Sequence, residues 1–566
     1  MDLSLLRHQS DSRYCFSLDE SHVLIRLAVS KILSLDDVKL IYGNPQGFTQ
    51  NHYFVNMELK HSDQAFNYYE VVLNIYMPRL MYVFYLVERG QEYYYSESGV
   101  SDEYIFDLAF ISAFQYIGEN YNDYVIEKPS WVGRVFYQIF PERFASSDRV
   151  DKSHVNMSWD SKELVNNRNA FLGGDLYGAA SKIPYLKSIG IGAIYLTPIH
   201  PSYSNHKYDV LDYYRIDPAF GGEEAFKELV DTAHDHDIKV MMDLVFNHCS
   251  YEHPFFQDVV RNGTASPYYE WFFVNGEYPS KNPLNFLCFG NFYHMPKLNT
   301  NNKEVQEYLI NVAKHYMEIY HVDGFRLDVS EGVAHDFWIR FKIALKDIDP
   351  EVLVIGENWY NSESYLGNNQ FDSVMNYPFL GVVSGYVNGN NDEEETAQLL
   401  DGLLMRYKDG NNRMMMNLLA SHDVQRFVHL CNLDKDLSLI GYSIMLFYIG
   451  YPSIYYGEEI FMDGADDPDN RRGMEWSSPL FNSKEHQLFV DLIKLRKEPS
   501  LAEGDIEISS VNGLLKIRRM LSGSGYVLYT NLSDRNVHVE GNVVISNHYV
   551  NKDIEPGGFA VFKVFN

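Results

Sequence analysis

Two acidic residues have the sequence context of catalytic carboxyl groups, and the first is Asp328. The stretch 324–329 (GFRLDV) alternates, with Arg326 and Asp328 at one parity and apolar residues at the other. Successive side chains of a strand point to opposite faces, so Arg326 and Asp328 would share a face, where the guanidinium could hold the carboxylate ionised and oriented. An ionised carboxylate can act as a nucleophile. A buried ion pair that only closes one end of a barrel explains this stretch equally well.

The second acidic residue is Glu357, which ends the apolar run 351–357 two positions before Trp359. A carboxyl group against an aromatic surface is partly desolvated, which favours its protonated form and lets it act as a general acid. One ionised and one protonated carboxyl group is the pair that cleavage of a glycosidic bond requires. Taken alone, this stretch is more typical of an ordinary strand end. The two stretches together predict a glycosidase.

A third carboxylate, Asp423, follows the run 418–421 with His422 beside it. These two side chains could hold the 2- and 3-hydroxyls of a sugar, and such contacts tighten as the ring flattens toward an oxocarbenium ion. The sequence therefore predicts three acids around one sugar.

Further polar residues end other predicted strands. The run 240–246 is nearly continuously apolar, as a buried parallel strand should be, and ends at Asn247 and His248. A histidine at the end of a barrel strand is more often functional than structural. His206 and Tyr208 follow another strand. We expect Tyr208 to stack on the reacting sugar and His206 to hydrogen-bond it.

The strands and helices expected after residue 126 explain how these residues could come together. After residue 126 the pattern alternates between strand and helix, which indicates a parallel sheet. Eight strands fit a (β/α)8 barrel, whose active site lies at the carboxyl ends of the strands. The expected strands are 134–140, 192–197, 238–246, 322–329, 352–357, 371–377, 414–421 and 452–456.

The fold predicted for the whole chain is multidomain α/β. Short β-branched and aromatic runs predict an N-terminal β-sandwich over 1–125, and 127–130 is expected to be a linker. The barrel would comprise 126–248 and 298–496, interrupted after its third strand by an aromatic inserted subdomain, 249–297. Short strands after residue 497 predict a C-terminal β-sandwich over 497–566.

Composition excludes several classes of partner. The formal charge of −30 disfavours nucleic acid and anionic membranes, which a polyanion would repel. Aromatic residues make up 15% of the 566 residues and, although most should be core, some could provide flat surfaces for sugars. The four cysteines have no CxxC spacing, so we expect reduced, mostly buried thiols. The sequence has no signal-like start and no membrane-spanning run, and a cytoplasmic protein is expected.

Four of these motifs, in order along the chain, resemble the four signature regions of the α-amylase superfamily. They are DLVFNH at 243–248, GFRLD at 324–328, Gly356-Glu357 and Ser421-His422-Asp423. The closer resemblance is to the cyclomaltodextrinase, neopullulanase and maltogenic amylase group. It is carried by FYQIFPERF at 136–144, MPKLN at 295–299 and DPDNRR at 467–472. The N-terminal module also resembles the starch-binding-type domain of that group.

The resemblance implies roles for the site residues. Asp328 would be the nucleophile, Glu357 the acid/base and Asp423 the stabiliser of the transition state. Residues expected to bind substrate are His206, Tyr208, His248, Arg326, Trp359 and His422 around the reacting glucose, and Asp467 with Arg471 around the next one.

The sequence departs from the group in two places. The usual Asn-Glu after the nucleophile is Glu331-Gly332 here, which affects the acceptor side and the balance of hydrolysis against transglycosylation. Relatives hold calcium with the loop after the first strand and a Gly-Gly-Asp. Here an Asn is missing from that loop. No cofactor is required by the chemistry, but a structural calcium could be held by Asp148, Asp151, Gly173 and Asp175.

The function predicted is a retaining α-glucan hydrolase that cleaves α-1,4 bonds of cyclodextrins, maltooligosaccharides and pullulan, with some transglycosylation. By the same resemblance the enzyme would be a homodimer. An α-glucosidase or a glucanotransferase is the alternative among enzymes. The alternative from another class is a non-catalytic carbohydrate-binding protein whose barrel has lost its enzymatic activity. The presence of all three acids argues against it.

Overall fold

The computed structural model of the chain describes residues 1–75, 79–118, 128–161, 164, 167–366 and 370–565. Contacts divide it into two compact units, Met1–Glu127 with Glu393–Arg413 and Lys128–Asp392 with Met414–Asn566. The expected domain boundary at residues 125 and 126 lies outside the described residues, as does the first residue of the expected linker 127–130.

The first unit is built on two antiparallel sheets. Its β-branched and aromatic runs 23–27, 38–42, 69–73 and 81–85, which predict strands, lie within β3 (His22–Ser30), β4 (Leu35–Gly43), β7 (Phe66–Asn74) and β8 (Arg79–Glu88). Apolar side chains at alternate positions, such as Ile25, Leu27 and Phe84, form a buried core. The other elements are β1 (Leu6–Arg7), β2 (Cys15–Ser17), β5 (Tyr53–Asn56), β6 (Glu58–Ser62), β9 (Gln91–Ser96), β10 (Gly99–Ser101), β11 (Phe114–Ile117), α1 (Ala109–Ser112), α11 (Glu393–Leu404) and α12 (Asp409–Met414), whose last residue passes the boundary.

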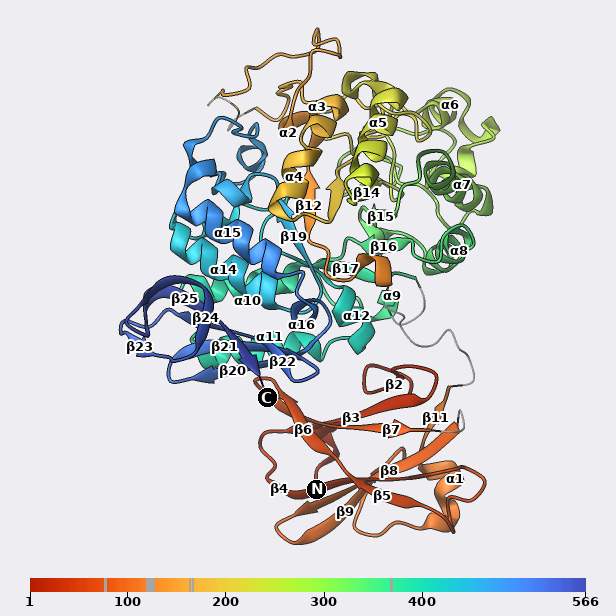
Figure 1. Cartoon of the computed structure of the whole chain (residues 1–566). Helices are drawn as coiled ribbons and strands as arrows, with labels where there is room; N and C mark the ends of the chain where they lie inside the picture. Colours follow the sequence, from red (N-terminus) through yellow and green to blue (C-terminus); the bar gives the residue numbers. More distant parts are fainter. Residues whose placement is uncertain (76–78, 119–127, 162–163, 165–166, 367–369, 566) are drawn as a thin grey trace. The chain divides into compact units, whose positions relative to one another are not determined.

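Eight parallel strands of the second unit close into a barrel (Figure 1). They are β12 (Phe136–Ile139), β13 (Ala193–Leu196), β14 (Lys239–Leu244), β15 (Gly324–Leu327), β16 (Leu353–Gly356), β17 (Ser373–Asn376), β18 (Met416–Leu418) and β19 (Tyr451–Tyr455). Seven lie within the expected ranges, and β19 begins one residue before its range. Except for Lys239, every strand residue is buried, which explains the nearly continuous apolar runs. The barrel prediction is confirmed.

Helices surround these strands (Figure 1). Helix α7 (Lys303–Tyr320) shows why they form: its buried residues recur every three or four positions, as at Val305, Leu309 and Val312, and the side chain of Asn302 caps its first turn. The other described α-helices of this unit are α2 (Pro141–Phe144), α3 (Leu176–Ser181), α4 (Ile183–Ile189), α5 (Gly222–Asp235), α6 (Pro254–Asn262), α8 (His335–Lys346), α9 (Glu363–Leu366), α10 (Tyr377–Val387), α13 (Phe427–Leu430), α14 (Lys435–Phe447), α15 (Lys484–Leu495) and α16 (Pro499–Ala502).

The inserted subdomain expected after the third strand is present between β14 and α7. A bridge between His248 and Lys297 closes its base, and further bridges and α6 build its interior. Phe256, Phe272 and Phe286 are buried there, and the rings of Phe272 and Phe286 pack on that of Phe256. The aromatic residues of this stretch therefore form the small core that an insertion of this length needs.

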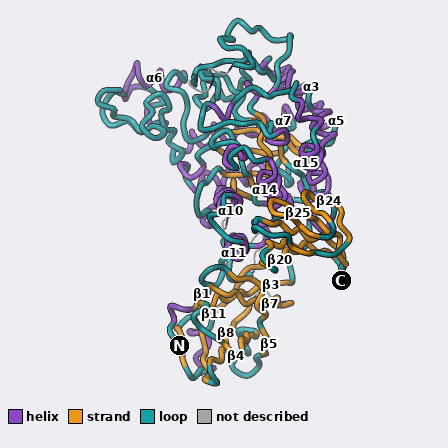
Figure 2. Tube along the Cα trace, turned by 90° about the vertical axis from the view of Figure 1, so that its left-hand side faces the viewer, coloured by secondary structure: helices purple, strands orange, loops and turns teal. Residues whose placement is uncertain are grey.

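The C-terminal residues form an antiparallel sheet of six strands. They are β20 (Asp505–Val511), β21 (Leu514–Leu521), β22 (Ser524–Asn531), β23 (Val537–His538), β24 (Asn542–Val550) and β25 (Asp553–Phe565). The sheet packs on α14 and α15 (Figure 2). The buried guanidinium of Arg519 donates hydrogen bonds to the carbonyl oxygens of Phe447 (3.0 Å) and Gly504 (2.9 Å), which joins the sheet to the end of α14.

Two expectations from composition can be compared with the described residues. All four cysteines are free, and all but Cys288 are buried, as expected. Among the described residues, no helix has the length and apolar character needed to span a bilayer.

Candidate active site

The three predicted catalytic acids lie at the carboxyl ends of barrel strands. Asp328 directly follows β15, Glu357 directly follows β16, and Asp423 lies five residues beyond β18. Since β15 and β16 are hydrogen-bonded neighbours, the backbone brings Asp328 and Glu357 to adjacent positions at the rim. The negative charge of Asp423 is also close enough to raise the pKa of Asp328. The structure therefore brings the three acids together.

One guanidinium links the acids of three strands. Arg326 is fully buried and forms ion pairs with Asp243 (2.9 Å), Asp328 (3.0 Å) and Glu357 (2.9 Å). A single positive charge cannot neutralise three carboxylates, so burial favours retention of protons by the cluster. Burial raises the pKa of Asp243 to about 6.

The same cluster raises the pKa of Asp328 well above the ordinary range. The causes are burial and the neighbouring Glu357 carboxylate, and Arg326 opposes them without outweighing them. This differs from the sequence expectation that Arg326 would hold Asp328 ionised, because the guanidinium is shared with Asp243 and Glu357. The physical consequence is that Asp328 gives up its proton only at a pH above the ordinary range of an aspartate.

Glu357 is held by N–H groups on both of its oxygens. The backbone N–H of Val329 donates to Oε2 (2.9 Å) and the indole N–H of Trp359 donates to Oε1 (3.1 Å). The sequence predicted an apolar wall at Trp359, but the indole is 44% exposed and stacks on Tyr377, with ring centroids 3.7 Å apart. Its contribution to Glu357 is a directed hydrogen bond.

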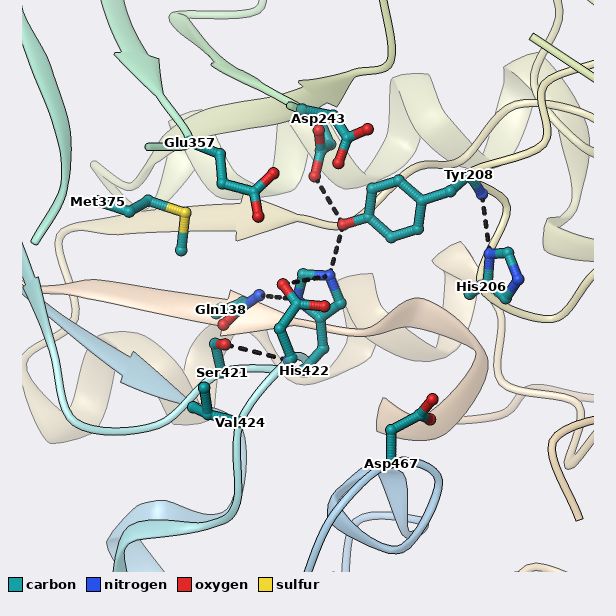
Figure 3. A network of polar contacts seen from close by, with 12 residues as sticks. Gln138, His206, Tyr208, Asp243, Glu357, Met375, Ser421, His422, Val424 and Asp467 are labelled. Carbon is teal, nitrogen blue, oxygen red and sulfur yellow. Dashed lines mark hydrogen bonds and ion pairs between the residues drawn. The ribbon is translucent and has the colours of Figure 1, made fainter. Parts of the chain in front are cut away.

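A chain of hydrogen bonds lies beside the acids (Figure 3). The side-chain amide of Gln138 donates to Nδ1 of His422 (2.8 Å), so Nε2 carries the ring proton. Nε2 lies 2.6 Å from the hydroxyl of Tyr208, which donates to Asp243 (3.0 Å). Burial lowers the pKa of His422 well below its ordinary value. The imidazole is therefore neutral and fixed in one tautomer.

Tyr208 and His206 lie at this site as predicted from the sequence. The ring of Tyr208 stacks in parallel on His422, with centroids 5.4 Å apart. Its backbone N–H donates to Nδ1 of His206 (3.1 Å), which leaves Nε2 of His206 as the protonated nitrogen. Burial lowers the pKa of His206 to about 4. A neutral imidazole with a fixed N–H can donate to a sugar hydroxyl.

Some buried polar atoms of the site have no hydrogen-bond partner among the described residues. They include Nε2 of His248 and Oδ2 of Asp328. His248 stacks on Phe289 of the inserted subdomain, with centroids 5.2 Å apart, and burial lowers its pKa to about 3. Unpaired polar atoms are costly in a buried site unless a ligand or water satisfies them. Both atoms are therefore available to a hydroxylated ligand.

Asp467 and Arg471 lie in the loop that follows β19, and Arg471 contacts both Asp467 and the catalytic residues. Arg471 forms an ion pair with Asp467 (3.0 Å), lies 3.7 Å from Asp423, and donates from Nε to the carbonyl oxygen of His422 (2.8 Å). Figure 3 shows Asp467 on the far side of His422 from Glu357. This pair extends the polar surface away from the catalytic acids.

Comparison with known proteins identifies the architecture and the motifs. Residues 138–491 match the model of the alpha amylase catalytic domain, and residues 1–117 match that of the alpha amylase N-terminal ig-like domain. The chain belongs to the α-amylase family. It is therefore a glycoside hydrolase, with the extra N-terminal domain that some α-amylase family members carry.

Several α-amylase family proteins are similar over most of their length. A cyclomaltodextrinase of Thermoanaerobacter pseudethanolicus is 37% identical over 93% of this chain and 92% of its own. Neopullulanase 2 of Thermoactinomyces vulgaris is 36% identical, over 89% and 86% respectively. A solved cyclomaltodextrinase structure superposes with a TM-score of 0.90 at 28% identity, over 100% of this chain and 98% of that one. The fold and the domain order are thus those of the cyclomaltodextrinase group.

The expected calcium ligands of this α-amylase family member are not gathered around a common point. Asp148 and Asp151 are exposed. The ammonium of Lys152 donates hydrogen bonds to the carbonyl oxygen of Gly173 and the carboxylate of Asp175. In the described part of the chain, no three acidic, histidine or cysteine side chains form a group that could hold a metal ion. The residues present do not fit a calcium site.

Sequence reasoning missed several residues of this α-amylase family site. Gln138 and Asp243 lie inside the motifs FYQIFPERF and DLVFNH, but they were not assigned roles. Tyr195 donates to Asp243 (2.7 Å), and Lys297 donates to the side chain of Asn247. A signal for the first two existed, since a polar residue inside a buried parallel strand must find a partner.

Proposed function

We propose that this enzyme is a retaining hydrolase of α-glucans that cleaves α-1,4 bonds of cyclodextrins, maltooligosaccharides and pullulan. The observation that carries the proposal is the adjacent pair Asp328 and Glu357 at the ends of neighbouring strands, joined by the guanidinium of Arg326. The names of similar proteins, cyclomaltodextrinase and neopullulanase, support the class of substrate.

In the proposed first step, Glu357 protonates the glycosidic oxygen while Asp328 attacks the anomeric carbon. A covalent glycosyl-enzyme forms and the leaving sugar departs with the proton. In the second step Glu357, now a base, removes a proton from water or from a sugar hydroxyl, which displaces Asp328. A retaining mechanism of this kind uses carboxyl groups about 5–5.5 Å apart.

Neighbouring residues would hold the reacting glucose. Asp423 would accept hydrogen bonds from its hydroxyls, and the Nε2–H of His422 would donate to a hydroxyl in a bifurcated hydrogen bond shared with Tyr208. These bonds strengthen as the ring flattens. Nε2 of His248 and the Nε2–H of His206 have the free hydrogen-bonding capacity for two further hydroxyls. Arg471 and Asp467 would take the next glucose along the chain. This arrangement accounts for every predicted substrate-binding histidine.

The acceptor side differs from that of the group at Glu331 and Gly332. A Cβ at Gly332 would collide with Oδ1 of Asn247, so a side chain at this position would require the Asn247 side chain to move. Glu331 is half-buried, and burial and the charge of Glu357 raise its pKa. In the orientation that satisfies both of its ends, the amide of Asn358 donates to Glu331 (3.0 Å) and to the carbonyl oxygen of Glu357 (3.0 Å). We propose that Glu331 sets the balance of hydrolysis against transglycosylation.

The assembly and location proposed for the enzyme follow from its relatives. The cyclomaltodextrinase group resemblance supports a homodimer, in which the N-terminal domain limits the site to short or cyclic glucans. Two similar proteins of Bacillus subtilis are named intracellular maltogenic amylase, and the free cysteines agree with a reducing compartment, so a cytoplasmic location is proposed. Light scattering of the purified chain tests the dimer.

The test of the function is a product analysis with β-cyclodextrin, pullulan and soluble starch as substrates. The proposal expects maltooligosaccharides from β-cyclodextrin and short products from pullulan, with slower attack on starch. An Asp328→Asn variant serves as the blank. Release of glucose alone would instead indicate an α-glucosidase, and larger transfer products without net hydrolysis would indicate a glucanotransferase. No turnover of any glucan would refute the proposed hydrolase.

A further inference from the structure

The loop that follows β12 is tied to the start of α3 by a lysine. The ammonium of Lys152 lies 2.6 Å from the carbonyl oxygen of Gly173 and 2.6 Å from Oδ2 of Asp175. The carboxylate of Asp175 is fully buried, whereas the Lys152 side chain is 28% exposed. The cation thus reaches from the surface to a carbonyl and a carboxylate, which are the oxygen types that a calcium ion would bind.

Both carboxylate oxygens of Asp175 already accept hydrogen bonds from the protein. Its Oδ2 accepts the N–H (2.7 Å) and O–H (3.1 Å) of Ser147 besides the Lys152 ammonium. Its Oδ1 accepts the N–H of Gly178 (2.7 Å), which makes Asp175 the N-cap of α3. A carboxylate that accepts four hydrogen bonds, one of them from a cation, is satisfied and charge-balanced.

The other expected ligands are engaged elsewhere or exposed. Asp151 accepts hydrogen bonds from the N–H (3.0 Å) and O–H (2.7 Å) of Ser153, which close a local turn. Asp148 is exposed at the surface. Without these two acids, only one carboxylate would face a calcium ion, and the lysine already neutralises it.

The backbone of the Gly-Gly-Asp segment is shaped around this arrangement. Gly173 has φ of +86°, which side chains rarely tolerate, and this turn directs its carbonyl oxygen to Lys152. A Cβ on Gly174 would collide with the carbonyl oxygen of Pro141, because the segment passes directly over the start of α2. The N–H of Asp175 donates to Ala145 (2.9 Å). The segment therefore keeps its close packing on the barrel with an ammonium in place of a metal.

We propose that the Lys152 ammonium is the built-in cation of this loop, so that the enzyme neither binds nor requires calcium there. The disagreement between the motif and its surroundings carries the proposal. The Gly-Gly-Asp is kept, but its oxygens are bound by a side chain of the same polypeptide. The stability of the loop then depends on a covalently attached charge and is indifferent to chelators.

Thermal unfolding of the purified full-length enzyme tests the proposal. The expected Tm of the wild type is the same in millimolar EDTA as in millimolar CaCl2. Lys152→Met keeps the length of the side chain and removes its charge, so it should lower Tm by about 2–4 °C in both buffers, because Asp175 loses its cation. Lys227→Met removes an exposed lysine that pairs with Asp231 on α5, and should leave Tm unchanged.

Two results would overturn the proposal. One is a wild-type Tm that falls in EDTA and recovers when CaCl2 is restored. The other is a Lys152→Met variant whose Tm equals that of Lys227→Met in both buffers. Should Lys152→Met not fold, the wild-type comparison and a calorimetric titration of the EDTA-treated enzyme with CaCl2 decide alone. The absence of binding heat supports the proposal, and saturable binding heat refutes it.

Discussion

The backbone N–H of Val329 donates a 2.9 Å hydrogen bond to Oε2 of Glu357. Val329 directly follows Asp328, so the residue after the proposed nucleophile orients the proposed acid. It does so from a left-handed conformation, with φ of 44°, which is costly for a β-branched residue. Strain of this kind persists only where the surroundings impose it. The relative position of the two carboxyl groups is therefore built into the backbone of β15 and β16.

The separate roles of the two acids predict different responses to the leaving group. Glu357→Gln should lower kcat/KM for maltotriose by about 10²–10⁴-fold, because an unactivated leaving group needs a proton. With α-maltosyl fluoride, whose leaving group needs little protonation, the first turnover of Glu357→Gln should be nearly as fast as that of the wild type. Asp328→Asn should be inactive on both substrates. Fluoride release in the first turnover is the measurement, and equal losses by Glu357→Gln on both substrates would contradict the assignment.

The hydrogen-bond chain predicts that Gln138 positions His422. Gln138→Leu removes the donor to Nδ1 and leaves a buried imidazole nitrogen unpaired, which costs about 1–3 kcal/mol. We expect kcat/KM for maltotriose to fall about tenfold or more, because His422 can then change tautomer and release Tyr208. Gln487→Leu, on the exposed face of α15, is the matched control and should keep full activity. An unchanged kcat/KM in Gln138→Leu would show that the chain does not position His422.

The raised pKa of Asp328 predicts the acidic limb of the pH profile. A nucleophilic carboxylate is active above its pKa, so activity should be lost as pH falls through that raised value, well above pH 4. Because Glu357 is the second cause of the raised pKa, Glu357→Gln should move the limb to lower pH. Profiles of kcat/KM with α-maltosyl fluoride measure both. A wild-type limb near pH 4, or no movement in Glu357→Gln, would contradict the electrostatic account.

A buried acid remote from the reaction predicts how stability depends on pH. Burial raises the pKa of Glu458, which pairs with Arg426 and accepts the hydroxyl of Tyr442, to about 7 from an ordinary 4.5. Between these values the folded state binds the proton more tightly than the unfolded state. Stability should therefore fall as pH rises from about 4.5 to about 7, by up to about 3 kcal/mol from this group.

Calorimetric Tm values at the two ends of that pH range measure this effect. Glu458→Gln cannot titrate, so its Tm should fall less with rising pH than that of the wild type. Glu224→Gln, on the exposed face of α5, should follow the wild type. If Glu458→Gln and the wild type lose the same Tm over this range, Glu458 does not retain its proton in the folded enzyme.

The fold could be predicted well because its signals are local. Strand and helix patterns alternate along the barrel sequence, and all eight strands lie within, or begin one residue before, the ranges that this alternation predicts. The positions of Asp328 and Glu357 followed from those strand ends. The family resemblance added Asp467 and Arg471, whose proximity to Asp423 depends on a loop that no periodicity describes.

The sequence did not reveal that several side chains pair with the same partner. Arg326 was expected to pair with Asp328, but Asp243 and Glu357 share its guanidinium, and this reversed the expected direction of the pKa of Asp328. The tautomer of His422 depends on Gln138, from a strand 284 positions away in sequence. Contacts of this kind arise only when the barrel closes.

The most direct test of the central claim is the anomeric configuration of the first product. The account holds that Asp328 displaces the leaving sugar and is then displaced itself, so two inversions restore the α configuration. Proton NMR during the first minutes of maltotriose hydrolysis, before mutarotation, should show the new reducing end as the α anomer. A β anomer as the first product would mean a single displacement by water, and it would contradict Asp328 as the nucleophile.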